Sequence, residues 1–549
     1  MHPSTPARSE PATDQNAHTV TDPAGERAAD AGVTAPDTPA DAGGNTAPDS
    51  AEARPIARGT RFRPALIWSY VVNLGGYAAI TLITLTLAAI LGPRQFGVLA
   101  MALVWITLAQ MLLQHGPTMA VIQHDHITDN HLNAAFWSTL AGALVFSVLF
   151  VVAAPLWAAV NRLPELTAVC LALTPIVLLQ AVTVIPDAVL RRRLQMRGIA
   201  LRYISAHLIS GVTAVICALQ GLGVWALVVQ QVGAHGLYAV MLWSVAPWRP
   251  RWGPIRRELR DIRGTSLKTL AGSLGTFTSL RADVIVMSAF FGPVVVGLFR
   301  FAIRFPEMVV DLTGRGLQAV ALPDLARHSM HASTLAARLR KLVHLGAVLS
   351  VPALGVLAGT ATPLVLIIGE QWAEAAAPLR LLCLASAATL VTSMLGPALQ
   401  AAQRPGLPAI LAWVNAAGSV GAILAAALSS SRAGTTTRLM AVAGAMVAVQ
   451  VLLAVTIVYL TFGRVLRASP WPTLAAALPS VVAAVAAAGS GTLVSSWAGP
   501  AVGPVLTFLL AGTVAGLVAA GVLLGLDREV RSWLSRAARK GRAVLRAAR

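Results

Sequence analysis

Fourteen long apolar runs constrain the folding of this chain more than any other feature, and they cover most of residues 64–526. Each run is long enough to cross about 30 Å of hydrocarbon as an α-helix. Lipid offers the backbone no hydrogen-bonding partner, so each run must satisfy its own peptide groups, and a helix does this within one segment. The sequence therefore predicts an all-α polytopic membrane protein with about 14 transmembrane helices. The runs are approximately 64–91, 95–122, 132–160, 165–190, 199–219, 223–246, 267–291, 295–321, 342–368, 375–402, 406–430, 438–462, 472–497 and 502–526.

The composition agrees with a membrane protein and excludes most soluble classes. Only 12% of the 549 residues are charged and 56% are hydrophobic, whereas soluble chains carry about 25% charged residues. The net charge of +19 does not indicate nucleic-acid binding, because the basic residues lie in short connectors between the apolar runs. Lysine occurs only at Lys268, Lys341 and Lys540 while arginine is abundant, which is typical of a GC-rich, bacterial genome.

The position of the basic residues predicts the topology. Basic residues gather on the cytoplasmic side of membrane proteins. If both termini lie in the cytoplasm and the spans alternate, the inner connectors and flanks hold most of the basic residues. The outer connectors then hold only Arg94, Arg162, Arg380, Arg432 and Arg438. We therefore expect a multi-pass protein of the bacterial cytoplasmic membrane with both termini inside.

A short repeat predicts the internal organisation. LGPRQFG (91–97) joins the first two runs, and FGPVVVG (291–297) joins the seventh and eighth. The two stretches are six spans apart, so both halves share one orientation. This predicts two six-helix lobes, 64–246 and 267–462, in a pseudo-two-fold repeat, with two additional helices in 472–526. The alternative is that Gly-Pro turns recur because they are common in membrane loops.

The two ends of the chain differ in composition from the spans. Residues 1–53 are rich in Ala, Pro, Thr and Asp and lack apolar periodicity, so we expect a disordered acidic tail. Residues 527–549 place apolar side chains on one helix face and many basic residues elsewhere. They predict a basic amphipathic cytoplasmic tail that lies on the anionic inner leaflet.

The eighth run carries a stripe of polar side chains within about 80° of one helix face. A charge at the centre of a membrane helix costs about 2.5–3.5 kcal/mol, so this stripe must face another lobe or a water-filled cavity. One interpretation is a cationic wall for an anionic head group, because the guanidinium fork suits phosphate. The alternative is structural ion pairing at helical spacing. The stripe comprises Arg300, Arg304, Glu307, Asp311, Arg315 and Gln318, and the seventh run adds Arg281 and Asp283.

Uncharged polar faces occur in the other half. The first run aligns Asn73 and Tyr77 with Thr81 and Thr84, and the second run aligns Gln114 with neighbouring polar side chains. Such faces are typical of a cavity lining and equally of hydrogen bonding between helices. The residues leave both interpretations open.

Several motifs resemble those of the polysaccharide repeat-unit exporters, the lipid-linked oligosaccharide flippases. The stretches are LGPRQFGVLAMALVWITLAQMLLQHGPTMAVIQHDHITDNHLNAAFW (91–137), RADVIVMSAFFGPVVVGLFRFAIRFPE (281–307) and ALPDLAR (321–327). The resemblance implies the fold of the multidrug/oligosaccharidyl-lipid/polysaccharide superfamily, with two six-helix bundles around a central cavity plus two extra helices. The matching positions include Leu91, Gly92, Pro93, Phe96, Gly97, Asn133, Ala135, Phe136, Trp137, Asp283, Gly292, Gly297, Ala302 and Arg304.

The resemblance also implies a function. It indicates a flippase that moves a polyprenyl-diphosphate-linked oligosaccharide across the membrane for lipopolysaccharide, exopolysaccharide or capsule biosynthesis. Glycan polymerases and glycosyltransferases would be partners besides the membrane lipids. The alternatives are a multidrug exporter or a lipid II flippase of the same superfamily. A membrane glycan polymerase or ligase is disfavoured by the short outer connectors.

The expected site follows from the stripe together with this resemblance. Arg281, Arg304 and Arg315 would hold the diphosphate, and Asp283, Glu307 and Asp311 would orient them, with Arg300, Asn73, Tyr77 and Gln114 completing the cavity wall. Nucleotide-binding and hydrolase motifs are missing from the sequence. We therefore expect no enzyme, no cofactor and no metal site, and transport driven by a proton or sodium gradient.

Overall fold

The computed structural model describes residues 80–115, 128–193, 195–252, 256–327, 332–402, 406–533 and 535–536. These residues are almost entirely helical and contain no β-strand. Eleven of their helices are long and apolar enough to cross a membrane, which confirms the prediction of an all-α polytopic protein. The predicted acidic tail and most of the predicted basic tail lie outside the described residues.

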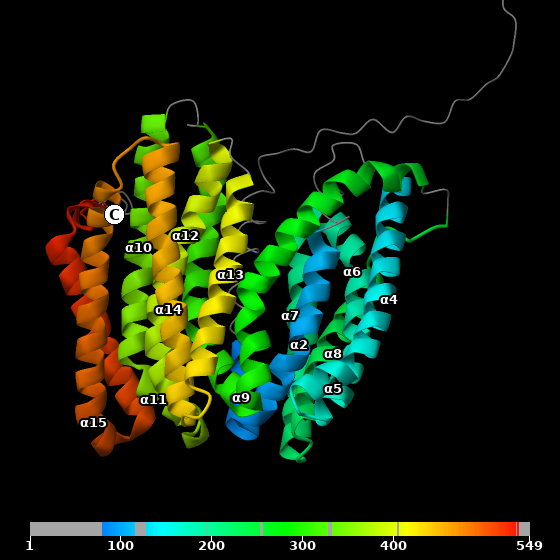
Figure 1. Ribbon diagram of the computed structural model, residues 1–549, viewed down its shortest axis with the longest axis horizontal. Helices are drawn as coiled ribbons and strands as arrows, with labels where there is room; N and C mark the ends of the chain where they lie inside the picture. The colour runs from blue at the N-terminus through cyan, green and yellow to red at the C-terminus, as the bar shows by residue number, and fades with distance from the viewer. Residues whose placement is uncertain are drawn as a thin grey trace, which may run out of the picture. The chain divides into compact units, whose positions relative to one another are not determined.

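The first half of the described chain contains seven helices. Residues 80–91 form the end of the first span. The helices α5 and α6 form one continuous span, Glu165–Arg192. They are separated only by a gap in the hydrogen-bond ladder at Thr174, because Pro175 has no N–H to donate. The remaining elements are α2 (Pro93–His115), α4 (Asp129–Val160), α5 (Glu165–Leu173), α6 (Pro175–Arg192), α7 (Met196–Leu219) and α8 (Val224–Trp243) (Figure 1).

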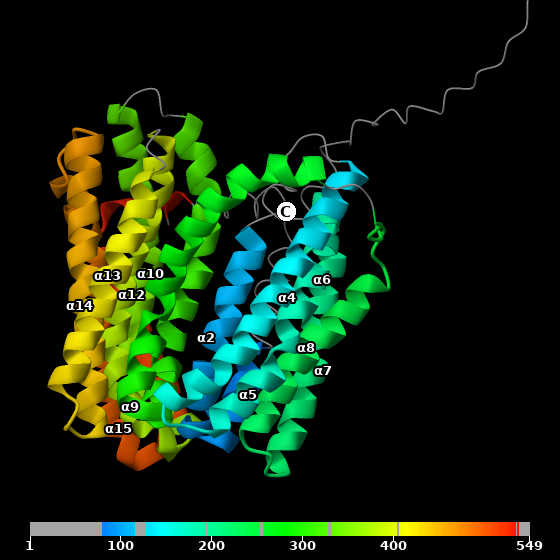
Figure 2. The same ribbon diagram turned by 45° about the vertical axis from the view of Figure 1, so that its right-hand side comes forward.

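The second half contains longer elements. They are α9 (Arg256–Arg327), α10 (Ala332–Gly359), α11 (Ala361–Ile368), η1 (Glu370–Ala375), α12 (Ala376–Ala401), α13 (Gly406–Ser429), α14 (Thr435–Tyr459), η2 (Leu460–Val465) and α15 (Trp471–Leu526). Helices α4 to α8 pack mostly on one another and on α2, whereas α10 and α12 to α14 pack on one another and on α9 (Figure 2). This grouping agrees with the two predicted lobes, and their boundaries stay predictions.

The helix α9 folds back on itself at Gly292. As one straight helix its 72 residues would span about 108 Å, more than three times the hydrocarbon thickness. Gly292 has φ 78° and ψ −179°, and Asp283 and Arg300 on either side of it form a salt bridge. The helix α9 therefore supplies two arms, as the two separate apolar runs predicted.

The helix α15 folds back in the same way at Gly503, which has φ 74° and ψ 164°. His344 of α10 contacts Ala476 in the first arm of α15 and Asp527 just after the second arm. The two ends of α15 therefore meet at one end of the bundle, as expected for two spans that cross the membrane in opposite directions.

The repeated Gly-Pro motifs pack against each other. Gly92 and Gly292 have nearly the same positive φ, 79° and 78°, which glycine adopts without steric cost. A Cβ atom at Gly97 would overlap the carbonyl group of Pro293, and a Cβ at Gly297 would overlap that of Pro93. A pseudo-two-fold axis between the two motifs produces such a reciprocal contact. Each motif needs its glycine because the backbone of the other motif packs directly against it.

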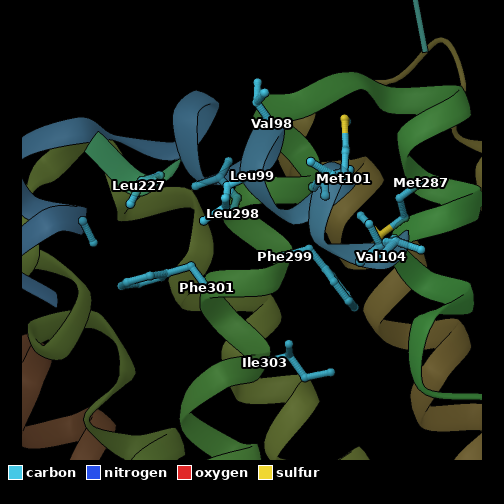
Figure 3. Packing of buried hydrophobic residues seen from close by; sticks show 14 of the residues in the cluster. Val98, Leu99, Met101, Val104, Leu227, Met287, Leu298, Phe299, Phe301 and Ile303 are labelled. Carbon is cyan, nitrogen blue, oxygen red and sulfur yellow. The ribbon is translucent and has the colours of Figure 1, made fainter. Parts of the chain in front are cut away.

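The largest buried cluster extends from this contact along α2 and α9. Figure 3 shows the two sets of side chains between the ribbons: Val98, Leu99, Met101 and Val104 from α2, and Met287, Leu298, Phe299, Phe301 and Ile303 from α9. Phe299 is fully buried. The polar stripe on the second arm of α9 thus begins beside the apolar seam that joins the two helix groups.

Candidate functional site

Arg300 lies at the centre of the charged cluster on α9. Its Nη1 donates a hydrogen bond to Oδ2 of Asp283 at 3.1 Å, and its Nη2 lies 3.9 Å from Oε2 of Glu307. The side chain of Arg300 is 18% exposed, that of Asp283 4% and that of Glu307 38%. The structure therefore places both carboxylates around Arg300, whereas the sequence predicted that they orient the neighbouring arginines.

The Asp283–Arg300 salt bridge joins the two arms of α9. Burying an ionised carboxylate is costly unless an opposite charge compensates it. Oδ1 of Asp283 is buried and finds no hydrogen-bond partner in the described part of the chain, so Arg300 is the residue that pairs with it directly. This salt bridge therefore joins the two arms across the fold-back at Gly292, and the loss of either partner alone would leave a buried charge uncompensated.

Two more arginines stand beside this salt bridge. Arg304 is exposed, and Arg281 lies within electrostatic reach of Asp283, Arg300, Arg304 and Glu307. The cluster thus has three guanidinium groups and two carboxylates, which leaves a positive excess. Exposed guanidinium groups in such surroundings suit a phosphate, because each can donate two parallel charge-assisted hydrogen bonds.

Of the other predicted site residues, the structure describes the side chain of Asp311 only. Asp311 is half-buried on the same arm of α9. Arg315 belongs to α9 and Gln114 to α2, but their side chains lie outside the described part. Asn73 and Tyr77 lie outside the described residues altogether.

One contact brings Thr81 of the first span next to the stripe. The hydroxyl group of Thr81 lies 3.8 Å from the sulfur atom of Met308, and it is oriented to donate to it. Met308 is about 80° around the helix from Arg300, at the edge of the stripe. Thr81 of the first span therefore lies beside the edge of the stripe.

Gln371 and Trp372 bind the end of the first span near the Gly-Pro motifs. Trp372 is fully buried, and its indole N–H donates to the carbonyl oxygen of Ala88 at 3.0 Å. The amide group of Gln371 donates to the carbonyl oxygens of Ala88 and Ala89 at 3.3 and 3.1 Å. The Trp372 ring stacks on Phe301 with centroids 4.1 Å apart. These bonds satisfy carbonyl groups in the last turn of the first span.

This outer clamp, Gln371 and Trp372, was not identified from the sequence. The stretch EQWAEA (370–375) forms a short 3₁₀-helix without apolar periodicity, so it gave no pattern to interpret. The one available signal was a tryptophan in a polar connector. The clamp joins the two helix groups at the end where the Gly92 turn lies, which is the outer side in the predicted topology.

A second set of contacts fixes the connector between the two halves. The side-chain oxygen of Asn133 accepts a hydrogen bond from the Arg251 N–H at 2.9 Å, and the Trp137 indole donates to the Arg251 carbonyl at 3.2 Å. Trp137 also stacks on Trp252 with centroids 3.8 Å apart. Asn133 and Trp137, two of the positions that match the exporter family, therefore hold the connector after α8 against α4.

Comparison with known proteins gives consistent matches. The family model described as polysaccharide biosynthesis protein matches residues 86–377. The succinoglycan biosynthesis transport protein ExoT of Rhizobium meliloti (strain 1021) is 26% identical over 369 residues, which cover 66% of this chain and 74% of ExoT. The teichuronic acid biosynthesis protein TuaB of Bacillus subtilis (strain 168) is 22% identical over 304 residues, covering 54% of this chain and 62% of TuaB.

Two solved structures share the fold. The lipid II flippase MurJ, in an inward closed conformation, superposes with a TM-score of 0.64 at 13% identity, covering 84% of this chain and 99% of MurJ. An inward-facing multidrug resistance MATE family transporter of the MOP superfamily gives a TM-score of 0.56 at 14% identity, covering 69% and 92%. The fold expected from the resemblance is therefore confirmed.

Proposed function

The chain belongs to the polysaccharide biosynthesis protein family, and from this premise we propose that it flips a polyprenyl-diphosphate-linked oligosaccharide across the bacterial cytoplasmic membrane. The product would serve lipopolysaccharide, exopolysaccharide or capsule biosynthesis. The family match, the relatedness to ExoT and TuaB and the shared fold with MurJ support this proposal. Both termini face the cytoplasm in this proposal, as the distribution of basic residues indicates.

The observation that carries the proposal is the positive excess around Arg300. Arg304 and Arg281 stand beside a salt bridge that neutralises Arg300, so they are the groups left to bind an anion. The diphosphate would contact these two arginines while the polyprenyl tail stays in lipid. Since a flippase must also release its substrate, a dispersed set of arginines serves it better than one tight site.

Movement between the two sides requires the outer end to open. The outer clamp would release Ala88 and Ala89 during each cycle, and the adjacent contact between the two Gly-Pro motifs would separate with it. We propose a proton or sodium gradient as the energy source. Glu307 is the partly exposed carboxylate closest to the arginines and is the first candidate to bind the coupling ion.

The alternatives belong to the same superfamily. The shared fold with MurJ keeps a lipid II flippase open as a second function. The positive excess of the cluster disfavours an exporter of organic cations, which would favour an acidic wall. Partnership with a glycan polymerase and glycosyltransferases, and the absence of catalytic activity of its own, belong to this proposal as well.

The experiment is genetic deletion with complementation in the native host. Cells without the gene should accumulate lipid-linked oligosaccharide on the inner leaflet and lose the surface polymer. The wild-type gene should restore both, and the Arg304→Ala variant should restore both only in part while reaching the same abundance. Deletion with normal surface polymer and no accumulation of the lipid-linked precursor would show that this proposal is wrong.

A further inference from the structure

A pocket of about 470 Å³ lies where the start of α10 meets both ends of α15. Three basic side chains line it: Arg340 and Lys341 from α10, and Arg528 from the segment after α15. The rest of the wall combines two carboxylates, one histidine and several apolar side chains. This pocket is separate from the charged cluster on α9, and the proposed function does not use it.

The carboxylate of Asp527 is already engaged within the protein. Its side chain is 4% exposed, and Oδ1 accepts hydrogen bonds from the backbone N–H groups of Glu529 and Val530 at 2.9 and 3.2 Å. Its other oxygen, Oδ2, lies 3.2 Å from Nε2 of His344. Asp527 therefore caps the helix that follows and faces His344, and among the described residues it forms no ion pair with the basic side chains.

His344 is held in one orientation by a backbone contact. Its Nδ1 lies 2.8 Å from the carbonyl oxygen of Ala476, so Nδ1 carries a proton and donates it. The other nitrogen, Nε2, faces Asp527 and lies 3.8 Å from Oε2 of Glu529, whose side chain is 59% exposed. Both carboxylates of the pocket are thus directed at His344.

The three basic side chains lack such partners. In the part of the chain that the structure describes, Arg340, Lys341 and Arg528 form no ion pair. The Nε–H of Arg340 is buried and has no acceptor among the described residues. A buried donor without an acceptor is unfavourable and is rare in native proteins. The pocket therefore offers positive charge and at least one donor to an anion that the described residues do not supply.

We propose that this pocket binds the phosphate group of an anionic phospholipid of the inner leaflet. In the topology proposed above, the start of α10 and both ends of α15 lie at the cytoplasmic boundary, where such phosphates are found. Guanidinium groups bind phosphate with parallel charge-assisted hydrogen bonds. The apolar part of the wall, Ala476, Pro479 and Leu526, suits the glycerol and the upper acyl chains. The bound lipid would tie α10 to both arms of α15.

The test measures the response of the purified full-length protein to added lipid. Thermal stability in a neutral detergent is followed while dioleoylphosphatidylglycerol or dioleoylphosphatidylcholine is added, and native mass spectrometry counts the lipids retained. A ligand that binds only the folded state raises stability as its concentration rises. We expect stabilisation of the wild type by phosphatidylglycerol and little effect of phosphatidylcholine.

Substitutions locate the response in the pocket. The double variant Arg340→Gln and Arg528→Gln should need about tenfold or more phosphatidylglycerol for the same stabilisation, because it loses charged hydrogen-bond donors. Arg338→Gln removes an exposed arginine of the same helix that does not line the pocket, so it is the matched control and should respond like the wild type. If the double variant does not fold, Arg340→Lys should show a weaker response because it keeps the charge and loses the fork.

Two results would overturn the proposal. Equal responses of the wild type and the folded variant would show that the pocket does not bind the lipid. Added inorganic phosphate tests whether the pocket binds a soluble phosphate instead of a phospholipid. If it stabilises the wild type as strongly as phosphatidylglycerol, and the double variant loses that effect, the ligand is a soluble phosphate ester and the assignment to a phospholipid is wrong.

Discussion

Removing the guanidinium group of Arg300 should destabilise the chain more than any other single change in the stripe. Asp283 is 4% exposed, and its salt bridge with Arg300 is the compensation for its buried charge. Breaking a buried ion pair from one side costs about 3–5 kcal/mol. The carboxylate of Glu307 is 38% exposed and lies 3.9 Å from Arg300, so Glu307→Gln should cost less than about 1 kcal/mol.

The assay compares stability and transport in the same set of variants. The variants Arg300→Ala, Arg304→Ala and Glu307→Gln are produced as fluorescent fusions, and the temperature at which half of the monodisperse protein is lost is measured. Arg300→Ala should lower this temperature and the abundance in membranes strongly. Arg304→Ala should leave both unchanged, because Arg304 is exposed, and it should impair transport at equal abundance.

A double variant checks the physical cause. When Asp283→Leu is combined with Arg300→Met, both members of the buried pair are removed together, and such replacements are often neutral or stabilising. We expect the double variant to recover most of the stability lost in Arg300→Met alone. If Arg300→Ala is as stable as the wild type, or if the double variant is no better than Arg300→Met, the reasoning about the buried salt bridge is wrong.

Three further changes test other parts of the account. Gly97→Ala and Gly297→Ala should each destabilise the protein by about 1–3 kcal/mol, because the added Cβ overlaps a carbonyl group of the facing motif. The control Gly421→Ala has open space around its Cβ position, so its thermal stability should equal that of the wild type. A disulfide between Ala89→Cys and Gln371→Cys, made in a background without Cys170, Cys217 and Cys383, should stop transport until it is reduced, because it locks the proposed outer clamp. Normal transport by the oxidised protein would contradict that role. Asn133→Ala and Trp137→Phe should each expose the connector around Arg251 to protease, because each removes one hydrogen bond to its backbone, and unchanged cleavage would show that these bonds do not hold the connector.

Hydropathy and local periodicity predict the helices of this chain well, because each span must satisfy its own backbone in lipid. The apolar runs on either side of Gly292 and Gly503 correspond to the two arms of α9 and α15. The Gly-Pro repeat predicts a relationship between the halves. It does not reveal that Gly97 packs on Pro293 and Gly297 on Pro93, because these contacts join residues about 200 positions apart.

The partners of the charged residues could not be predicted in the same way. Helical periodicity relates residues of one helix, so it suggests neighbours such as Arg304 and Glu307. The structure instead connects Arg300 with Asp283 across the fold-back at Gly292, and with Glu307 two turns along the helix. The contact of Trp372 with Ala88 and that of His344 with Asp527 likewise join distant segments whose meeting depends on the complete fold.

Transport by purified protein in liposomes tests the central claim most directly. The wild type and Arg304→Ala are reconstituted at equal amounts with a fluorescent polyprenyl-diphosphate-linked oligosaccharide and an imposed ion gradient, and a membrane-impermeant quencher reports the lipid that changes leaflet. We expect the wild type to exceed protein-free liposomes and Arg304→Ala to be about tenfold slower, as the loss of one charged hydrogen-bonding contact implies. Wild-type protein that moves the substrate no faster than empty liposomes, or an Arg304→Ala variant as fast as the wild type, would contradict the account.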